Sequence, residues 1–143
     1  MKLEILSFEW DVFKSDDVVS VNVMTKNGEV TILENHMPII TSINPGVLFI
    51  QYKEKDTGKI LQTEFAVWRG VLEVGHNSSK ILIDMLVSSE NLDAEKAEKA
   101  RQEAITLMEK YKNSKDKVDM EKFIEAEDML FKSIAQLKLS NIK

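Results

Sequence analysis

Cysteine is absent from the sequence, which excludes a disulfide framework and any thiolate for catalysis or metal binding. Histidine is scarce: His36 and His76 are the only two, and since a zinc site needs three or four clustered ligands, we expect no metal. There is no Gly-x-x-x-x-Gly-Lys phosphate loop, which argues against a P-loop ATPase. No run approaches the roughly 20 apolar residues that span a bilayer. A net charge of −5 gives no support to nucleic-acid binding.

Glycine and proline, the residues that most often interrupt regular structure, are confined to the first part of the chain. The last of them is Gly75, and neither type occurs between Ser88 and Lys143. We therefore predict two domains, a strand-rich one over residues 1–88 and a helical one over residues 89–143.

The stretch from residue 28 to residue 50 reads GEVTILENHMPIITSINPGVLFI and predicts short strands joined by turns. Its strand-forming runs are Val30–Leu33, Ile39–Ser42 and Val47–Ile50. We expect Gly28 and Gly46 to adopt positive φ in the turns that flank these runs. Pro38 cannot donate to a sheet ladder, so it should lie at the start of a strand.

Other strands are expected on both sides of this stretch, because turn residues recur roughly every 8–12 positions, as in an antiparallel sandwich or barrel. Val19, Val21 and Val23 alternate with polar residues, which is the pattern of a half-buried strand. Two hairpins should follow, with loops at residues 55–58 and 75–79. The last strand should run over Lys80–Val87.

After residue 91 the apolar pattern changes to the helical period of about 3.6. Asp93 is placed to cap a first helix, and a polar break at residues 112–117 separates this helix from a second. Asp119 should cap the second helix, which carries more apolar surface than the first can cover, so the remainder should meet the strands or another protein. The predicted fold class is α+β: an N-terminal antiparallel β-sandwich followed by a C-terminal antiparallel two-helix hairpin.

The stretch 28–50, with its order Gly-Glu-x-x-Ile-Leu-x-x-His-x-Pro-Ile-Ile-Thr-x-Ile-x-Pro-Gly, resembles the hallmark segment of the epsilon subunit of bacterial F-type ATP synthases. That subunit corresponds to the mitochondrial delta subunit. Leu92–Ala97 resembles the family's Leu/Ile-Asp-x-x-Arg-Ala at the start of its helical hairpin, and Ile134–Lys138 resembles its Ala-x-Leu-basic ending. Trp68 and Arg69 depart from the pattern, because the family usually has a small residue and two glycines where only Gly70 matches.

The resemblance implies a non-catalytic subunit of the central stalk, or rotor, of a proton- or sodium-translocating ATP synthase. Its expected location is the cytoplasmic face of the cell inner membrane, held there peripherally and only through partners. The implied partners are the gamma subunit and the ring of c subunits, which bind the sandwich, and the alpha/beta catalytic hexamer, which an extended hairpin enters. That extended form blocks ATP hydrolysis in many bacterial members. The residues matching rotor-facing positions of the family are Ser7, Glu29, His36 and Thr41.

A nucleotide site is also implied, because some bacterial members bind ATP through the Leu/Ile-Asp-x-x-Arg-Ala motif and two arginines on the second helix. Here Lys96 replaces the motif's arginine, and Lys132 and Gln136 occupy the second-helix positions. Lysine keeps the charge but lacks the planar fork that suits phosphate. We therefore expect at most weak ATP binding and no resident cofactor. The residues of this candidate site are Leu92, Asp93, Lys96, Ala97 and Lys132.

Two other classes of protein are alternatives to this one. A stand-alone β-sandwich binding module, for example for carbohydrate, would use exposed aromatic residues, and Trp10 and Trp68 are the only tryptophans. An enzyme would need a nucleophile beside a base, and no such pair stands out in the sequence.

Overall fold

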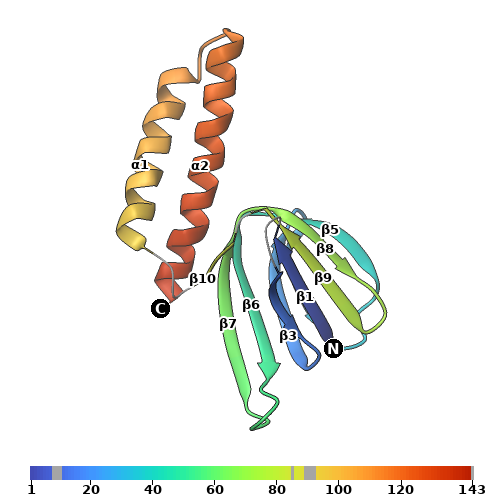
Figure 1. Ribbon diagram of the computed structural model, residues 1–143. Helices are drawn as coiled ribbons and strands as arrows, with labels where there is room; N and C mark the ends of the chain where they lie inside the picture. Colours follow the sequence, from blue (N-terminus) through green and yellow to red (C-terminus); the bar gives the residue numbers. More distant parts are fainter. Residues whose placement is uncertain (8–10, 85, 89–92, 143) are drawn as a thin grey trace.

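The strands of this chain gather into one body and its two helices stand beside it, in the computed structural model, which describes residues 1–7, 11–84, 86–88 and 93–142 (Figure 1). The strands are β1 (Lys2–Ser7), β2 (Asp11–Ser15), β3 (Val18–Thr25), β4 (Gly28–Leu33), β5 (Ile39–Ile43), β6 (Gly46–Lys53), β7 (Ile60–Val67), β8 (Gly70–Val74), β9 (Ser78–Ile83) and β10 (Leu86–Ser88). The helices are α1 (Ala94–Tyr111) and α2 (Lys117–Ile142). The predicted α+β class, a sandwich followed by a helical hairpin, is confirmed.

The strands form a curled sheet in the order β10–β7–β6–β3–β5–β8–β9–β1–β2, with β4 paired to β3 beside this path (Figure 1). Neighbouring strands are antiparallel except for β1 and β9, which are parallel. These two strands are far apart in the sequence, so no tight turn fixes their relative direction. The parallel pair is therefore an exception within the antiparallel arrangement that the sequence predicts.

The interior of the sandwich is filled by apolar side chains that alternate with outward-facing ones along each strand. The fully or almost fully buried members of this core are Leu3, Ile5, Val18, Val21, Val23, Ile32, Ile43, Leu48, Ile50, Phe65, Val67, Leu72, Val74, Ile81 and Ile83. Val19 is only half-buried, because the pairing of β3 with β6 shifts register between Val18 and Ser20. The sequence pattern predicts that Val19, Val21 and Val23 all face the core, and this is wrong at Val19. A β-bulge places Val18 in the core instead.

Gly28 and Gly46, the two glycines of the stretch 28–50, serve different purposes. Gly28 has a φ of 111° in the turn between β3 and β4, as predicted. Gly46 does not have a positive φ, so that prediction is wrong. Its lack of a side chain matters instead, because an added Cβ would lie 3.2 Å from the Cβ of Met24. The left-handed conformation before β5 belongs to Asn35, which has a φ of 65°.

Two strand assignments also differ from the sequence prediction. The expected strand Lys80–Val87 is divided, because β9 ends at Ile83 and the chain then crosses to pair with β7 as β10. Strand β2 was not predicted, and it forms by pairing with β1. Both differences arise from pairing with distant strands, which a local pattern does not record.

The two helices begin at aspartates, although only one of these was identified correctly. Asp93 caps α1 as predicted, and its Oδ1 accepts a hydrogen bond from the Lys96 amide at 3.1 Å. The prediction that Asp119 caps the second helix is wrong, because α2 already starts at Lys117. Asp116 has that role, since its Oδ1 accepts from the Val118 amide at 3.0 Å.

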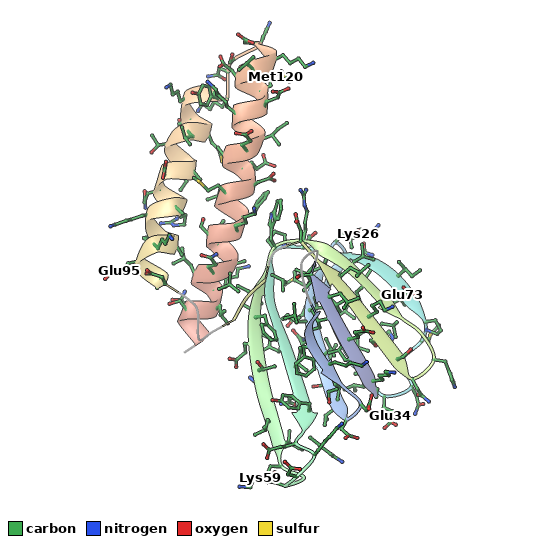
Figure 2. All side chains as sticks on the ribbon, in the orientation of Figure 1. Lys26, Glu34, Lys59, Glu73, Glu95 and Met120 are labelled. Atoms are coloured by element: carbon green, nitrogen blue, oxygen red, sulfur yellow. The ribbon has the colours of Figure 1, made fainter. Side chains whose placement is uncertain are left out.

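The helical hairpin meets the sandwich mainly through the last turns of α2, which lie against β6 and β7 (Figure 1). Ala135 and Leu139 of α2 bury Ala66 of β7 completely. The rest of the apolar face of α2 is not covered in this way, and its most exposed members are Val118, Met120, Ile124 and Phe131. Figure 2 labels Met120 at the end of the hairpin far from the sandwich. The sandwich therefore covers only part of the excess apolar surface predicted for the second helix.

Candidate subunit-contact surface

A groove of about 660 Å³ lies at the edge of the sandwich where β1 and β9 end and β8 begins. The strand register explains its lining, because Ser42 pairs with Val71, Val71 with Leu82, and Leu82 with Leu6. Directly paired residues point to the same side of a sheet. These four side chains therefore form one row across β5, β8, β9 and β1, on the face that points away from the core.

The apolar members of this face are unusually exposed. Val71 is 42% and Leu82 48% exposed, and Ile40, two residues before Ser42 on β5, is 74% exposed. Arg69 and Asp84 also line the groove, and Arg69 Nε lies 3.7 Å from Asp84 Oδ2. A contiguous apolar surface with a charged rim is typical of a site that binds another protein.

Gly70 brings the strands beneath this groove close together. Gly70 pairs with Ile83, and an added Cβ at Gly70 would overlap the carbonyl oxygen of Leu82 and lie 3.1 Å from the Cα of Ile83. Only glycine allows this approach of two backbones. The groove thus has a rigid wall of backbone atoms on this side, which fixes the positions of Val71 and Leu82.

The four contact residues predicted from the family lie in different places. Ser7 lines the groove, at the end of β1. Glu29 is exposed near the start of β4, and His36 lies in the turn between β4 and β5, with its Nδ1 2.7 Å from the carbonyl oxygen of Met37. Thr41 lies on the inward face of β5, and its buried Oγ1 has no hydrogen-bond partner among the residues that the structure describes. The structure therefore brings only Ser7 to this groove, and the contact role of all four stays a prediction.

Val71, Leu82 and Ile40 were not predicted as contact residues, although the sequence contains a signal for them. Leu82 stands between the buried Ile81 and Ile83, Val71 stands beside the buried Leu72, and Ile40 follows the partly buried Ile39. Such runs without polar alternation are typical of strands that are covered on both faces. Here the sandwich covers one face only, so the run itself indicates a missing partner.

A second cavity, of about 350 Å³, lies between the two helices and β10 and brings together Asp93, Lys96 and Lys132 of the candidate nucleotide site. Ala97 is 2% exposed. Leu92 lies outside the described residues. Two lysines on different helices could hold phosphate oxygens as point charges, without bidentate hydrogen bonds. Nucleotide binding therefore stays a prediction.

Ionisable groups on α1 interact away from both cavities. Arg101 donates to Glu98 through Nη2 at 2.8 Å and Nε at 3.2 Å, and these hydrogen bonds lower the pKa of the Glu98 carboxyl. The same hydrogen bonds raise the pKa of Arg101.

Across the described part of the chain, no three His, Asp or Glu side chains gather closely enough to hold a metal ion. No helix within the described ranges is both long and apolar enough to cross a membrane.

An uncovered apolar groove on a sandwich is typical of a surface that binds another protein. The family model for the ATP synthase, Delta/Epsilon chain, beta-sandwich domain matches residues 1–89. The ATP synthase epsilon chain of Neisseria meningitidis serogroup B is 31% identical over 96% of this chain and 91% of its own length. That of Delftia acidovorans is 35% identical over 82% and 79% respectively.

Solved structures agree at the level of the fold. A chain in the Euglena gracilis mitochondrial ATP synthase (OSCP/F1/c-ring) matches 99% of this chain and 80% of its own, with a TM-score of 0.74 and 22% identity. A chain in the Tetrahymena thermophila mitochondrial ATP synthase central stalk and c-ring matches 63% and 67%, with a TM-score of 0.53 and 17% identity. The chain belongs to the ATP synthase delta/epsilon family. This confirms the resemblance and the prediction of a non-catalytic stalk subunit, and favours it over a stand-alone binding module.

Proposed function

We propose that this subunit joins the gamma subunit of an F-type ATP synthase to its ring of c subunits, so that both turn together during proton or sodium translocation. Support comes from family membership, with relatives matched over almost the full length of both chains. Such a subunit would lie peripherally on the cytoplasmic side of the inner membrane, and would reach the membrane through its partners.

The observation that carries this proposal is the uncovered apolar face around the groove. Ile40, Val71 and Leu82 together expose enough surface that burying them would contribute about 4 kcal/mol, before the entropic cost of association. That gain is available only when a partner covers the face. A rotor subunit must bind its neighbours stably, and an apolar patch on a rigid sheet can provide such binding.

A charge placed in the groove tests this assignment. Leu82→Lys puts an ammonium group on an already exposed position, so the sandwich should fold, while binding to a purified assembly of gamma and the c ring should weaken about tenfold or more. Ile60→Lys is the matched control, because Ile60 is 60% exposed and lies far from the groove. It is the first residue of β7, next to the turn where Figure 2 labels Lys59. Failure of the unaltered chain to bind, or equal weakening by both variants, would overturn the proposal.

We also propose that the hairpin inhibits ATP hydrolysis only modestly. An extended hairpin could present Met120, Ile124 and Phe131 to the alpha/beta hexamer. The first half of α2 is acidic, through Glu121, Glu125, Glu127 and Asp128, which opposes approach to an acidic partner. Removing residues 90–143 should raise hydrolysis by the whole enzyme less than about tenfold. A larger rise would show that the hairpin is a strong inhibitor.

A further inference from the structure

Trp68 is a large side chain buried on the outside of the sandwich. It directly follows β7 and is only 5% exposed. Phe65 and Val67 belong to the interior core, whereas Ala66, between them, faces outward and is buried under α2. Trp68 is two residues after Ala66, beyond the end of the strand. The ammonium group of Lys132, on α2, lies over its ring.

The covering residues lie on one face of α2. Lys132, Ala135 and Leu139 are three and four positions apart, which is the spacing of neighbours on one side of a helix. Ala135 and Leu139 pack on Ala66, and the Lys132 Nζ lies 4.2 Å from the centroid of the Trp68 ring. The end of α2 thus lies along β7, with Lys132 at the Trp68 end of the contact.

The apolar part of this junction is small. Its fully buried members are Ala66, Ala135 and Leu139, with Val47 and Val87 partly buried beside them. Alanines allow a close approach but exclude little surface from water. Two parts of a chain joined by so small an apolar contact are expected to move relative to each other unless something else holds them.

Trp68 supplies the additional contact. Arg69 Cζ lies 3.9 Å from the ring centroid, so two cations lie over one ring, one from the sandwich and one from the hairpin. Tryptophan is the strongest aromatic partner for a cation, and the attraction grows when the ring is shielded from water. By comparison, Lys122 lies 5.4 Å from the Tyr111 ring within the hairpin itself.

We propose that Trp68 and Lys132 form a latch that holds the hairpin on the sandwich. Arg69, which is paired with Asp84, lies over the ring from the sandwich side, and Lys132 closes the latch from α2. Opening the hairpin breaks the Lys132 contact and exposes the Trp68 ring to water. The proposal concerns the hairpin alone and holds whether or not the chain binds gamma.

A single thiol beneath the hairpin can measure the opening. The chain has no cysteine, so Ala66→Cys introduces a unique reporter at a position that α2 buries completely. Slow labelling of this thiol in the full chain reports the fraction of time that the hairpin is open. In that background, Lys132→Met keeps the bulk of the side chain and removes the charge. We expect it to raise the labelling rate about fivefold, and Lys132→Arg to restore slow labelling.

Two controls separate the latch from general loosening. Lys122→Met removes a cation from an aromatic ring on the same helix, away from the junction, and should leave the labelling rate unchanged. A second reporter in the sandwich core, Val23→Cys, should label no faster when Lys132→Met is added, because Val23 is exposed only by unfolding of the sandwich. Equal rates with and without Lys132→Met, or equal acceleration by Lys122→Met, would overturn the latch. If Lys132→Met also speeds labelling at Val23→Cys, the variant destabilises the whole chain, and the latch is refuted.

Discussion

The Gly70→Ala variant adds one methyl group where β8 begins beside β9. An added Cβ would overlap the carbonyl oxygen of Leu82 and approach the Cα of Ile83 to 3.1 Å. Both atoms belong to the backbone, so no change of rotamer can relieve the overlap. The end of the β8–β9 ladder must therefore open, and the hydrogen bond from the Asp84 amide to the Arg69 carbonyl, 3.1 Å long, is lost with it.

The size of the effect follows from these contacts. Overpacking a well-fitted site costs about 1–3 kcal/mol, and a lost backbone hydrogen bond costs about 1 kcal/mol. The free energy of unfolding of the sandwich should therefore fall by about 2–4 kcal/mol. For a domain of this size, such a loss lowers the melting temperature by roughly 10–25 °C. Because Gly70 forms part of the groove, partner binding should weaken as well.

Urea unfolding followed by circular dichroism measures this loss. The comparison requires that the free energy of unfolding falls with urea concentration at the same slope in the variant and in the unaltered chain. Gly75→Ala is the matched control, since Gly75 follows the other end of β8 and an added Cβ there would meet its nearest atoms, from Ser78, at 3.6 and 3.7 Å. This control should change stability by no more than about 1 kcal/mol. If Gly70→Ala proves as stable as Gly75→Ala, the close approach of β8 and β9 is not the constraint described here.

Three further predictions concern the hairpin. Asp116→Ala should destabilise the start of α2 by about 1 kcal/mol and speed hydrogen exchange there more than Asp119→Ala does; equal effects would contradict the assignment of the cap. Because the pKa of Glu98 is lowered, its stabilisation of α1 is complete above the unfolded-state pKa and is lost as the pH falls through the folded-state pKa. In an NMR titration, Arg101→Ala should raise the Glu98 midpoint toward the ordinary range of a glutamate, and an unchanged midpoint would refute the stated cause. Isothermal titration should detect no micromolar binding of ATP; if it does, Lys96→Ala tests whether the cavity between the helices is the site.

The order of secondary structure was readable from the sequence because strands and helices leave different periods, and because glycine and proline stop before the helices begin. The Asp93 cap was equally readable, since the cap and the first turn are close in sequence. At the start of α2 two aspartates lie three residues apart, and local pattern alone does not distinguish Asp116 from Asp119. Strand pairing was less accessible: the parallel contact of β1 with β9 depends on how the whole sheet curls.

The candidate site was only partly predictable for a related reason. Ser7 was found because it stands at a family position, and it does line the groove. Val71 and Leu82 fit the pattern of ordinary strand residues, since an apolar residue in a strand usually faces a core. The apolar runs around them indicate strands covered on both faces, and only the structure shows that the sandwich leaves the outer face of these residues exposed. In the sequence, Trp68 stands out as one of two tryptophans and as a departure from the family pattern, but its contact with Lys132 is not predictable, because Lys132 is far away in the sequence.

The central claim, that the outer face around the groove binds the rotor, can be tested most directly by photocross-linking in the assembled ATP synthase. A benzophenone side chain at Ile40, which is 74% exposed beside the groove, should cross-link to gamma or to a c subunit. The same side chain at Ile60, at the opposite end of the sandwich, should give neither product. Rotor adducts from Ile60 in equal yield, or none from Ile40 in a complex that contains the chain, would contradict the claim.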